Sequence, residues 1–262
     1  MSASFLRRLL RRWLWDQWQV LWDEVKPRPR LDPKPMVVLL VTAVSLTLQE
    51  YWGDRQTFRD LVPPGTFPFS AYWELASFGW WSGFRVVGYL VVPMIAIAAM
   101  PGERVRDYGL SFKGFRKHAW IYVVLYLLVL PAVLAASCTR PFQYTYPFYK
   151  LASRSLLDFL AWELLYGLQF LSLEFFFRGF ILFGLRPSLG PHAIWVMCVP
   201  YCMIHYGKPM AETLGAIVAG LVLGTLSLRT RSIWCGVLVH VSVALTMDLL
   251  ALPHCRSHGR CP

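Results

Sequence analysis

Leu171-Ser-Leu-Glu-Phe-Phe-Phe-Arg-Gly-Phe-Ile-Leu-Phe183 is an almost wholly apolar stretch that contains one carboxylate and one guanidinium, those of Glu174 and Arg178. A spacing of four residues puts both side chains on one face of a helix, where they can pair. An ionisable residue in a membrane interior costs about 3 kcal/mol or more, so such residues face a partner or a wet cavity. The stretch therefore predicts a membrane helix with a paired charge at a functional position.

The composition of the chain agrees with a membrane protein. The 262 residues are 56% hydrophobic and 16% charged, whereas soluble domains carry about 25% charged residues. The net charge of +11 is gathered in the N-terminal segment and in short connections. This distribution is typical of the cytoplasmic flanks of membrane helices, so we expect no nucleic-acid partner.

Seven apolar segments follow one another along the chain, and most approach the ~20 residues that span a bilayer. They cover residues 36–51, 79–100, 119–138, 155–185, 191–206, 211–228 and 233–252. The expected fold class is therefore all-α, a polytopic membrane helix bundle of about seven transmembrane helices.

The residues before the first apolar segment are predicted to form a basic amphipathic helix. In residues 4–25, apolar side chains recur every three or four positions with arginines between them, which is typical of helices that lie on anionic membranes. The chain then divides into an arm with a Pro-rich linker (1–35), N-terminal transmembrane helices (36–150), a core that carries the candidate site (151–252) and a polar tail (253–262).

Basic residues also predict the orientation of the chain. With seven spans, the N-terminal segment, loop 101–118, Arg186 and turn 229–231 fall on one side, which the positive-inside rule makes cytoplasmic. We expect an integral protein of the cell membrane, the inner membrane of a bacterium, with a cytoplasmic N-terminus. The tail would lie outside, where Cys255 and Cys261 form a local disulfide if the environment is oxidising and stay free thiols otherwise.

Two later apolar segments each add a histidine to the charged pair. At 1.5 Å per residue, Glu174, His205 and His240 lie roughly 18, 21 and 12 Å from the same membrane face, so the three side chains can meet in one layer. Glu212 and Asp248 lie at roughly 25 and 24 Å and are expected to line the outer mouth of the bundle.

A carboxylate and two imidazoles suit the activation of water. We expect Glu174 to take a proton from water while His205 holds or relays it, and His240 to donate to the developing oxyanion, with Arg178 orienting the carboxylate. Zinc is the alternative, because two histidines and a carboxylate can form a three-ligand site. His-Glu-x-x-His does not occur, so no standard zinc motif indicates a metal cofactor, and a metal stays an open alternative.

Four segments resemble, in this order, the motifs of the CPBP (CAAX protease and bacteriocin-processing, or Abi) intramembrane proteases. They are Glu174-Phe-Phe-Phe-Arg178-Gly179, Tyr201-Cys-Met-Ile-His205, Leu223-Gly-Thr-Leu-Ser-Leu-Arg-Thr-Arg-Ser-Ile-Trp234 and His240. The resemblance covers about residues 155–250 and implies a glutamate-dependent endopeptidase that cleaves near the C-terminus of its substrate. Its partners would be membrane lipids and a membrane-anchored or lipidated protein. The supporting residues are then Arg178, Tyr201, Glu212 and Asp248.

Two positions depart from the CPBP pattern. Leu173 stands where the family has the first of two adjacent glutamates, to which the activation of water is usually assigned. Ala244 stands where the family has an asparagine that donates to the oxyanion. A smaller change is Tyr201, which replaces a phenylalanine. Three functions therefore stay open: an endopeptidase, an inactive relative that binds membrane peptides or confers bacteriocin-type immunity, and a proton- or ion-coupled transporter.

Overall fold

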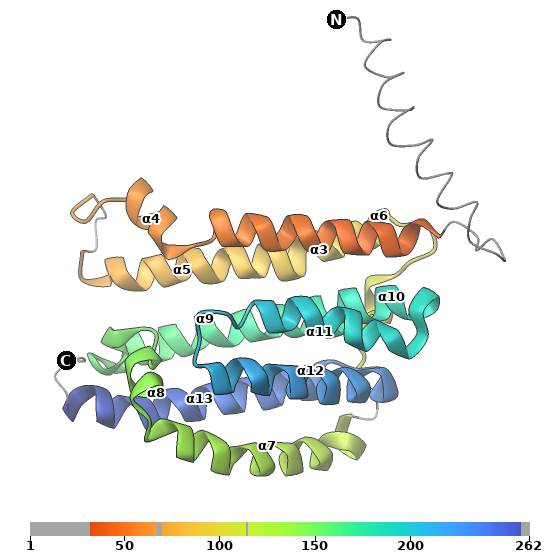
Figure 1. Cartoon of the computed structure of the whole chain (residues 1–262). Coiled ribbons are helices and arrows are strands. Elements are labelled where there is room, and N and C mark those ends of the chain that lie inside the picture. Colours follow the sequence, from red (N-terminus) through yellow and green to blue (C-terminus); the bar gives the residue numbers. More distant parts are fainter. Residues whose placement is uncertain (1–31, 67–69, 114, 258–262) are drawn as a thin grey trace, which may run out of the picture. The chain divides into compact units, whose positions relative to one another are not determined.

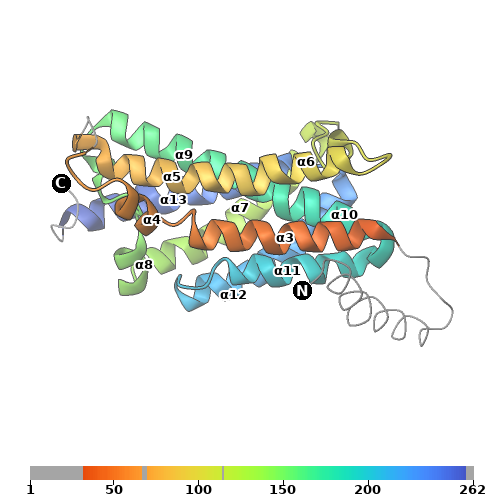
Figure 2. The ribbon, with the colours of Figure 1, turned by 90° about the horizontal axis from the view of Figure 1, so that it is seen from above.

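The computed structural model describes residues 32–66, 70–113 and 115–257. Most of these residues form helices or short helical turns, and none of them forms a β-strand (Figures 1 and 2). The predicted all-α class is confirmed. The helices are α3 (Pro33–Tyr51), α4 (Arg55–Leu61), α5 (Trp73–Val86), α6 (Val92–Ala99), α7 (Phe115–Ser137), α8 (Arg140–Thr145), α9 (Leu156–Glu174), α10 (Leu182–Leu189), α11 (Ala193–Met203), α12 (Met210–Thr230) and α13 (Trp234–Ser257).

Two π-helical stretches lie inside the longer helices, and short 3-10 turns lie between others. The π-helical stretches are η3 (Val87–Val91), between α5 and α6, and η6 (Phe175–Ile181), between α9 and α10. The 3-10 turns are η2 (Ser70–Tyr72), η4 (Val105–Asp107), η5 (Lys150–Ser153) and η7 (Gly190–His192).

Fewer helices are long enough to span a membrane than the sequence predicted. Five helical stretches are long and apolar enough within the described residues, or six if the bent pair α3–α4 is one span. The fifth predicted span, 191–206, corresponds to α11. Its 11 residues rise only about 16 Å, and α11 follows the central helix through η7 to give one stretch, Leu156–Met203.

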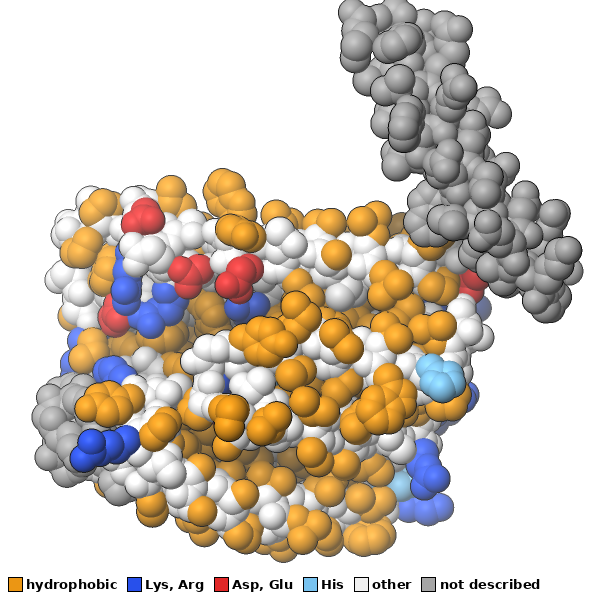
Figure 3. Space-filling model, viewed as in Figure 1, with side chains coloured by type: hydrophobic (Ala, Val, Ile, Leu, Met, Phe, Trp, Pro, Cys, Tyr) orange, Lys and Arg blue, Asp and Glu red, His pale blue; other side chains and the backbone are white. Residues whose placement is uncertain are grey.

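The surface of the bundle agrees with a position in the membrane. Hydrophobic side chains cover most of the side of the bundle in Figure 3, and charged side chains gather toward its two ends. Helix α7 has large exposed apolar residues along its length, and its buried residues are only Tyr122 and Ser137. Because exposed apolar area of this extent is unfavourable in water, the chain is an integral membrane protein.

Several predictions for the chain ends lie outside the described residues. These are the amphipathic helix at 4–25, most of the linker, and a disulfide between Cys255 and Cys261. The linker was predicted to extend to residue 35, but α3 already begins at Pro33. Proline is well tolerated in the first turn of a helix, because the missing N–H would have no partner there.

The central helix is formed by α9, η6 and α10 in succession. Every residue from Ser172 to Leu185 is buried. Helices α5 and α13 pack against α9, α11 packs against α10 and α12, and α7 lies on the outer side of α13 (Figure 1). The apolar stretch that contains Glu174 and Arg178 is therefore at the centre of the bundle.

The π-helical part of the central helix is packed closely on its neighbours. The ring of Tyr89 in η3 lies 4.8 Å from that of Phe176 in η6. Gly179 faces the backbone carbonyl oxygen of Tyr108, and an added β-carbon would lie 2.9 Å from it, so only glycine fits. π-helical turns are often found at functional sites, and this one directly follows Glu174.

The basic connections meet at one end of the bundle, as their sequence positions predicted. Leu110 pairs with Ser232 in an isolated bridge, and Arg186 and Arg231 line one pocket together with Lys34. The side of the membrane that this end faces stays a prediction.

Candidate functional site

Glu174 is the centre of a buried polar cluster. It is the last residue of α9 and its side chain is fully buried. Its Oε1 atom lies 2.6 Å from Nδ1 of His240 in α13 and 3.2 Å from Nη1 of Arg178 in η6. The predicted Glu174–Arg178 pair is confirmed. Because a carboxylate only accepts hydrogen bonds, Nδ1 of His240 carries the proton and donates it.

The second carboxylate oxygen of Glu174 is positioned by close packing and not by a hydrogen bond. Oε2 makes no hydrogen bond to the described residues and lies against the α-carbon of Gly236, near the start of α13. A β-carbon at Gly236 would overlap Oε2 and would lie 3.1 Å from the carboxyl carbon. Nothing in the sequence pattern distinguishes this glycine, because its partner is distant along the chain.

Gly236→Ala is expected to displace the Glu174 carboxylate and lengthen its bond to His240. We expect a loss of about 1–3 kcal/mol in stability, the usual cost of overpacking, measured by thermal unfolding of the purified protein in detergent. Gly215→Ala is the matched control, because a β-carbon there meets nothing within 4 Å. An equal unfolding temperature for the two variants would contradict this role for Gly236.

Tyr201 joins both histidines to the cluster. Its hydroxyl lies 2.9 Å from Nε2 of His240, and its backbone carbonyl oxygen accepts a hydrogen bond of 2.8 Å from Nδ1 of His205. The Arg178 guanidinium lies over the tyrosine ring, 3.9 Å from its centroid, in a cation–π contact. The structure thus brings together five residues predicted from the sequence: Glu174, Arg178, Tyr201, His205 and His240.

The two histidines are the more accessible members of the cluster. The His240 side chain is 16% exposed, whereas Glu174 and Arg178 are fully buried. His205 is half-buried and lies beyond the end of α11, in the connection to α12, rather than within a spanning helix as predicted. Since Nδ1 of His205 donates to a carbonyl group, neutral His205 keeps a lone pair on Nε2 that can accept a proton.

The two positions that depart from the CPBP pattern are in apolar surroundings. Leu173 is 4% exposed and belongs to the same core as the phenylalanines of η6. Ala244 is buried among aromatic side chains that include Trp162 and Tyr166. Neither position therefore places a polar group beside the histidines.

Asp248 is separate from the cluster. It is 1% exposed, so the prediction that it lines an outer mouth is wrong. It accepts a hydrogen bond of 2.5 Å from the indole N–H of Trp162 and contacts the carboxyl group of Glu163. Glu163 was not selected from the sequence, because a single acidic residue in α9 gives no signal until Asp248 is seen beside it.

Glu212 also has partners of its own. Its carboxylate accepts a hydrogen bond of 2.8 Å from the Tyr146 hydroxyl and pairs with Lys208 at 2.8 Å. Burial, together with the negative charge of Glu212, raises the pKa of Tyr146 well above its usual range, so the phenol stays protonated and donates. Glu212 therefore binds Tyr146 and Lys208 and does not contact the histidines of the cluster.

Among the residues that the structure describes, no group of three or more His, Cys, Asp or Glu side chains is arranged to hold a metal ion.

The fold and the site together define an integral membrane protein whose helices enclose a buried Glu–Arg–His cluster. Residues 153–246 match the family model described as type II CAAX prenyl endopeptidase Rce1-like. This segment contains the central helix, Tyr201 and both histidines, and the match confirms the predicted relationship to the CPBP proteins. No curated protein and no solved structure matches the chain.

Proposed function

We propose that the protein is a CAAX-protease-like intramembrane endopeptidase, which hydrolyses a lipidated or membrane-embedded peptide near its C-terminus. The family match supports this class of activity. The observation that carries the proposal is the double contact of Tyr201, which draws both imidazoles to one residue inside an apolar bundle. An imidazole can accept a proton and return it in the course of one reaction.

In this proposal, His205 is the base. A water proton passes to Nε2 of His205 while the water oxygen bonds to the scissile carbonyl carbon. When the carbon–nitrogen bond breaks, the same proton is returned to the leaving amine. The Tyr201 carbonyl oxygen holds the imidazole with Nε2 available throughout.

Glu174 acts in this proposal by orienting His240. Both of its oxygens are enclosed, one by His240 and Arg178 and the other by Gly236. The role of Glu174 as the base therefore stays a prediction from the sequence, and in this proposal the carboxylate holds the His240 ring by accepting from Nδ1. A proton on Nε2 of His240 would be donated to the Tyr201 oxygen, which leaves the phenol proton to stabilise the oxyanion. Tyr201 would then replace the donor that is missing at Ala244.

The proposed setting is the cell membrane, with the basic end of the bundle in the cytoplasm. Lysine and arginine in short loops are retained on the cytoplasmic side, and loop 101–118, Arg186 and Arg231 lie at that end. A membrane-anchored substrate would enter between helices rather than from water.

The test is cleavage of a membrane-anchored peptide by the full chain in liposomes. We expect a peptide with a farnesylated cysteine three residues before its C-terminus to lose its last residues, detected by mass spectrometry as a new C-terminus. The double variant His205→Ala/His240→Ala, prepared identically, controls for contaminating proteases. Equal cleavage by the wild type and the double variant would refute the proposal.

A non-catalytic, peptide-binding relative is the second candidate. The observation in its favour is the apolar surroundings of Leu173, where the family has its first glutamate. This function predicts that the peptide binds but is not cut, and that binding survives replacement of both histidines. Leu173→Glu distinguishes the two, because gain of cleavage only in that variant would show that the wild-type site lacks its base.

A further inference from the structure

A pocket of about 310 Å³ lies at the basic end of the bundle, away from the polar cluster. It is lined by residues from α3, from the connection between α6 and α7, from α10 and from the turn after α12. The volume would hold about ten water molecules at ~30 Å³ each, which is room for a phosphate group and a small substituent. The pocket has no part in the proposed proteolysis.

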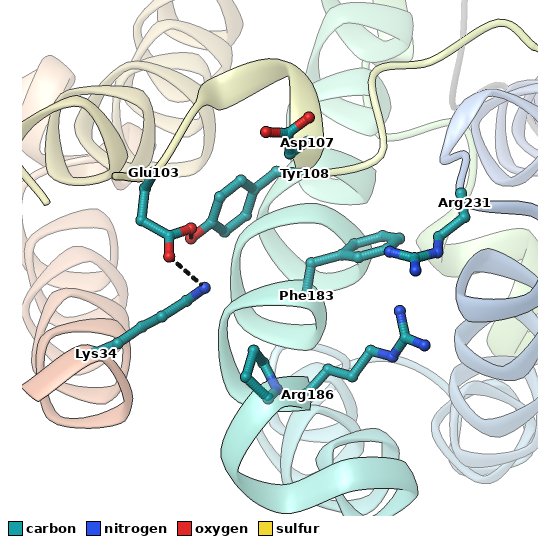
Figure 4. A pocket seen from close by; sticks show the side chains of 8 residues that line it. Lys34, Glu103, Asp107, Tyr108, Phe183, Arg186 and Arg231 are labelled. Atoms are coloured by element: carbon teal, nitrogen blue, oxygen red, sulfur yellow. Dashed lines mark hydrogen bonds and ion pairs between the residues drawn. The ribbon is translucent and has the colours of Figure 1, made fainter. Parts of the chain in front are cut away.

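Two arginines converge in this pocket. Figure 4 shows the guanidinium groups of Arg186 and Arg231 extending toward each other beside the ring of Phe183. Within the described part of the chain, neither guanidinium forms an ion pair or a hydrogen bond. Two positive groups repel each other at such a site unless an anion lies between them.

The acidic residues of the pocket do not supply that anion. Glu103 is paired with Lys34 at 2.8 Å and accepts a hydrogen bond of 2.7 Å from the Tyr108 hydroxyl. Burial and the bond to Glu103 raise the pKa of Tyr108 well above its usual range, so it remains a donor. Asp107 points away from the two guanidinium groups (Figure 4).

The backbone at Arg231 has a conformation that ends the helix before it. Its φ angle is +57°, in the left-handed region that favours glycine. Arg231 is the C-terminal cap of α12, and helices commonly end with one residue in this conformation. From this turn its guanidinium extends toward that of Arg186 in the lining of the pocket (Figure 4).

We propose that Arg186 and Arg231 bind a phosphate group, and that its source is the headgroup of an anionic phospholipid. Guanidinium groups match phosphate oxygens with paired hydrogen bonds. Exposed apolar side chains of α3 begin next to Lys34, at Met36, Leu39 and Leu40, and offer a surface for the acyl chains. Free phosphate would leave that surface unused, which favours the lipid.

The test is lipid binding to the detergent-solubilised full chain, followed by native mass spectrometry. We expect phosphatidylglycerol to bind more tightly than phosphatidylcholine with the same acyl chains. Arg186→Gln and Arg231→Gly should each weaken phosphatidylglycerol binding about fivefold, and Arg186→Lys should weaken it less. Glycine is the usual residue in the left-handed conformation of a helix end, so a folding defect in Arg231→Gly is not expected to obscure its result.

Arg229→Gln is the matched control, because Arg229 is exposed at the same turn but does not line the pocket. It should bind phosphatidylglycerol as the wild type does. An equal loss in Arg229→Gln would overturn the proposal in favour of diffuse surface charge, and so would unchanged binding in both pocket variants. Displacement of the lipid by millimolar inorganic phosphate would overturn the lipid as the source.

Discussion

Glu174→Ala is expected to destabilise the protein by about 3–5 kcal/mol, because it leaves a buried charge without its partner. Arg178 is fully buried, and its contacts are the carboxylate at 3.2 Å and the ring of Tyr201. None of its guanidinium nitrogens makes a hydrogen bond to the described residues. The ion pair is therefore the main compensation for burying that charge. Unfolding of the purified protein in detergent, followed by heat or denaturant, measures the loss.

The double variant Glu174→Ala/Arg178→Met separates the cost of an unpaired charge from that of a cavity. Methionine fills part of the arginine volume without a charge, so the double variant should be more stable than Glu174→Ala alone. Such a difference is the non-additivity expected of residues in contact. If the double variant is equally or less stable, the buried charge is not the reason for the loss.

The fold class and the Glu174–Arg178 pair could be predicted from the sequence, because both depend on local signals. Apolar segments identify membrane helices regardless of their partners. The spacing of Glu174 and Arg178 required only helical geometry, and their pairing is confirmed. The number of spans was less predictable, since an apolar run such as 191–206 does not show that its helix ends at Met203.

The arrangement within the site required the structure. Distances along the helices predicted that His205 and His240 lie at a similar depth in the membrane. They did not show that each histidine contacts a different atom of Tyr201. Gly236 and Glu163 were missed because their partners, Glu174 and Asp248, are far away in the sequence. Asp248 was placed at the outer mouth because distance along a helix reports depth and not which way a side chain faces.

His205→Ala is expected to lower the rate of peptide cleavage by about 10²–10⁴-fold, the usual contribution of a general base. The physical reason is the free lone pair on Nε2 of His205. His240 does not offer a free Nε2, because that atom forms a hydrogen bond with the Tyr201 hydroxyl. The initial rate of product formation from the farnesylated peptide in liposomes measures the effect. His192→Ala is the control, because His192 is exposed in η7 and its loss should leave the rate unchanged.

A lower rate could also come from a distorted site, so the stability of the variant decides how the result is interpreted. His205 is half-buried and its side chain makes one hydrogen bond, to the Tyr201 carbonyl group. Its removal should therefore change the unfolding temperature much less than Glu174→Ala does.

Tyr201→Phe gives the second comparison: it keeps the carbonyl that orients His205 but removes the hydroxyl. If His205 is the base and the phenol stabilises the oxyanion, both variants lose rate while staying folded. Full activity in His205→Ala would assign the base to another residue, and His240 would be the next to test.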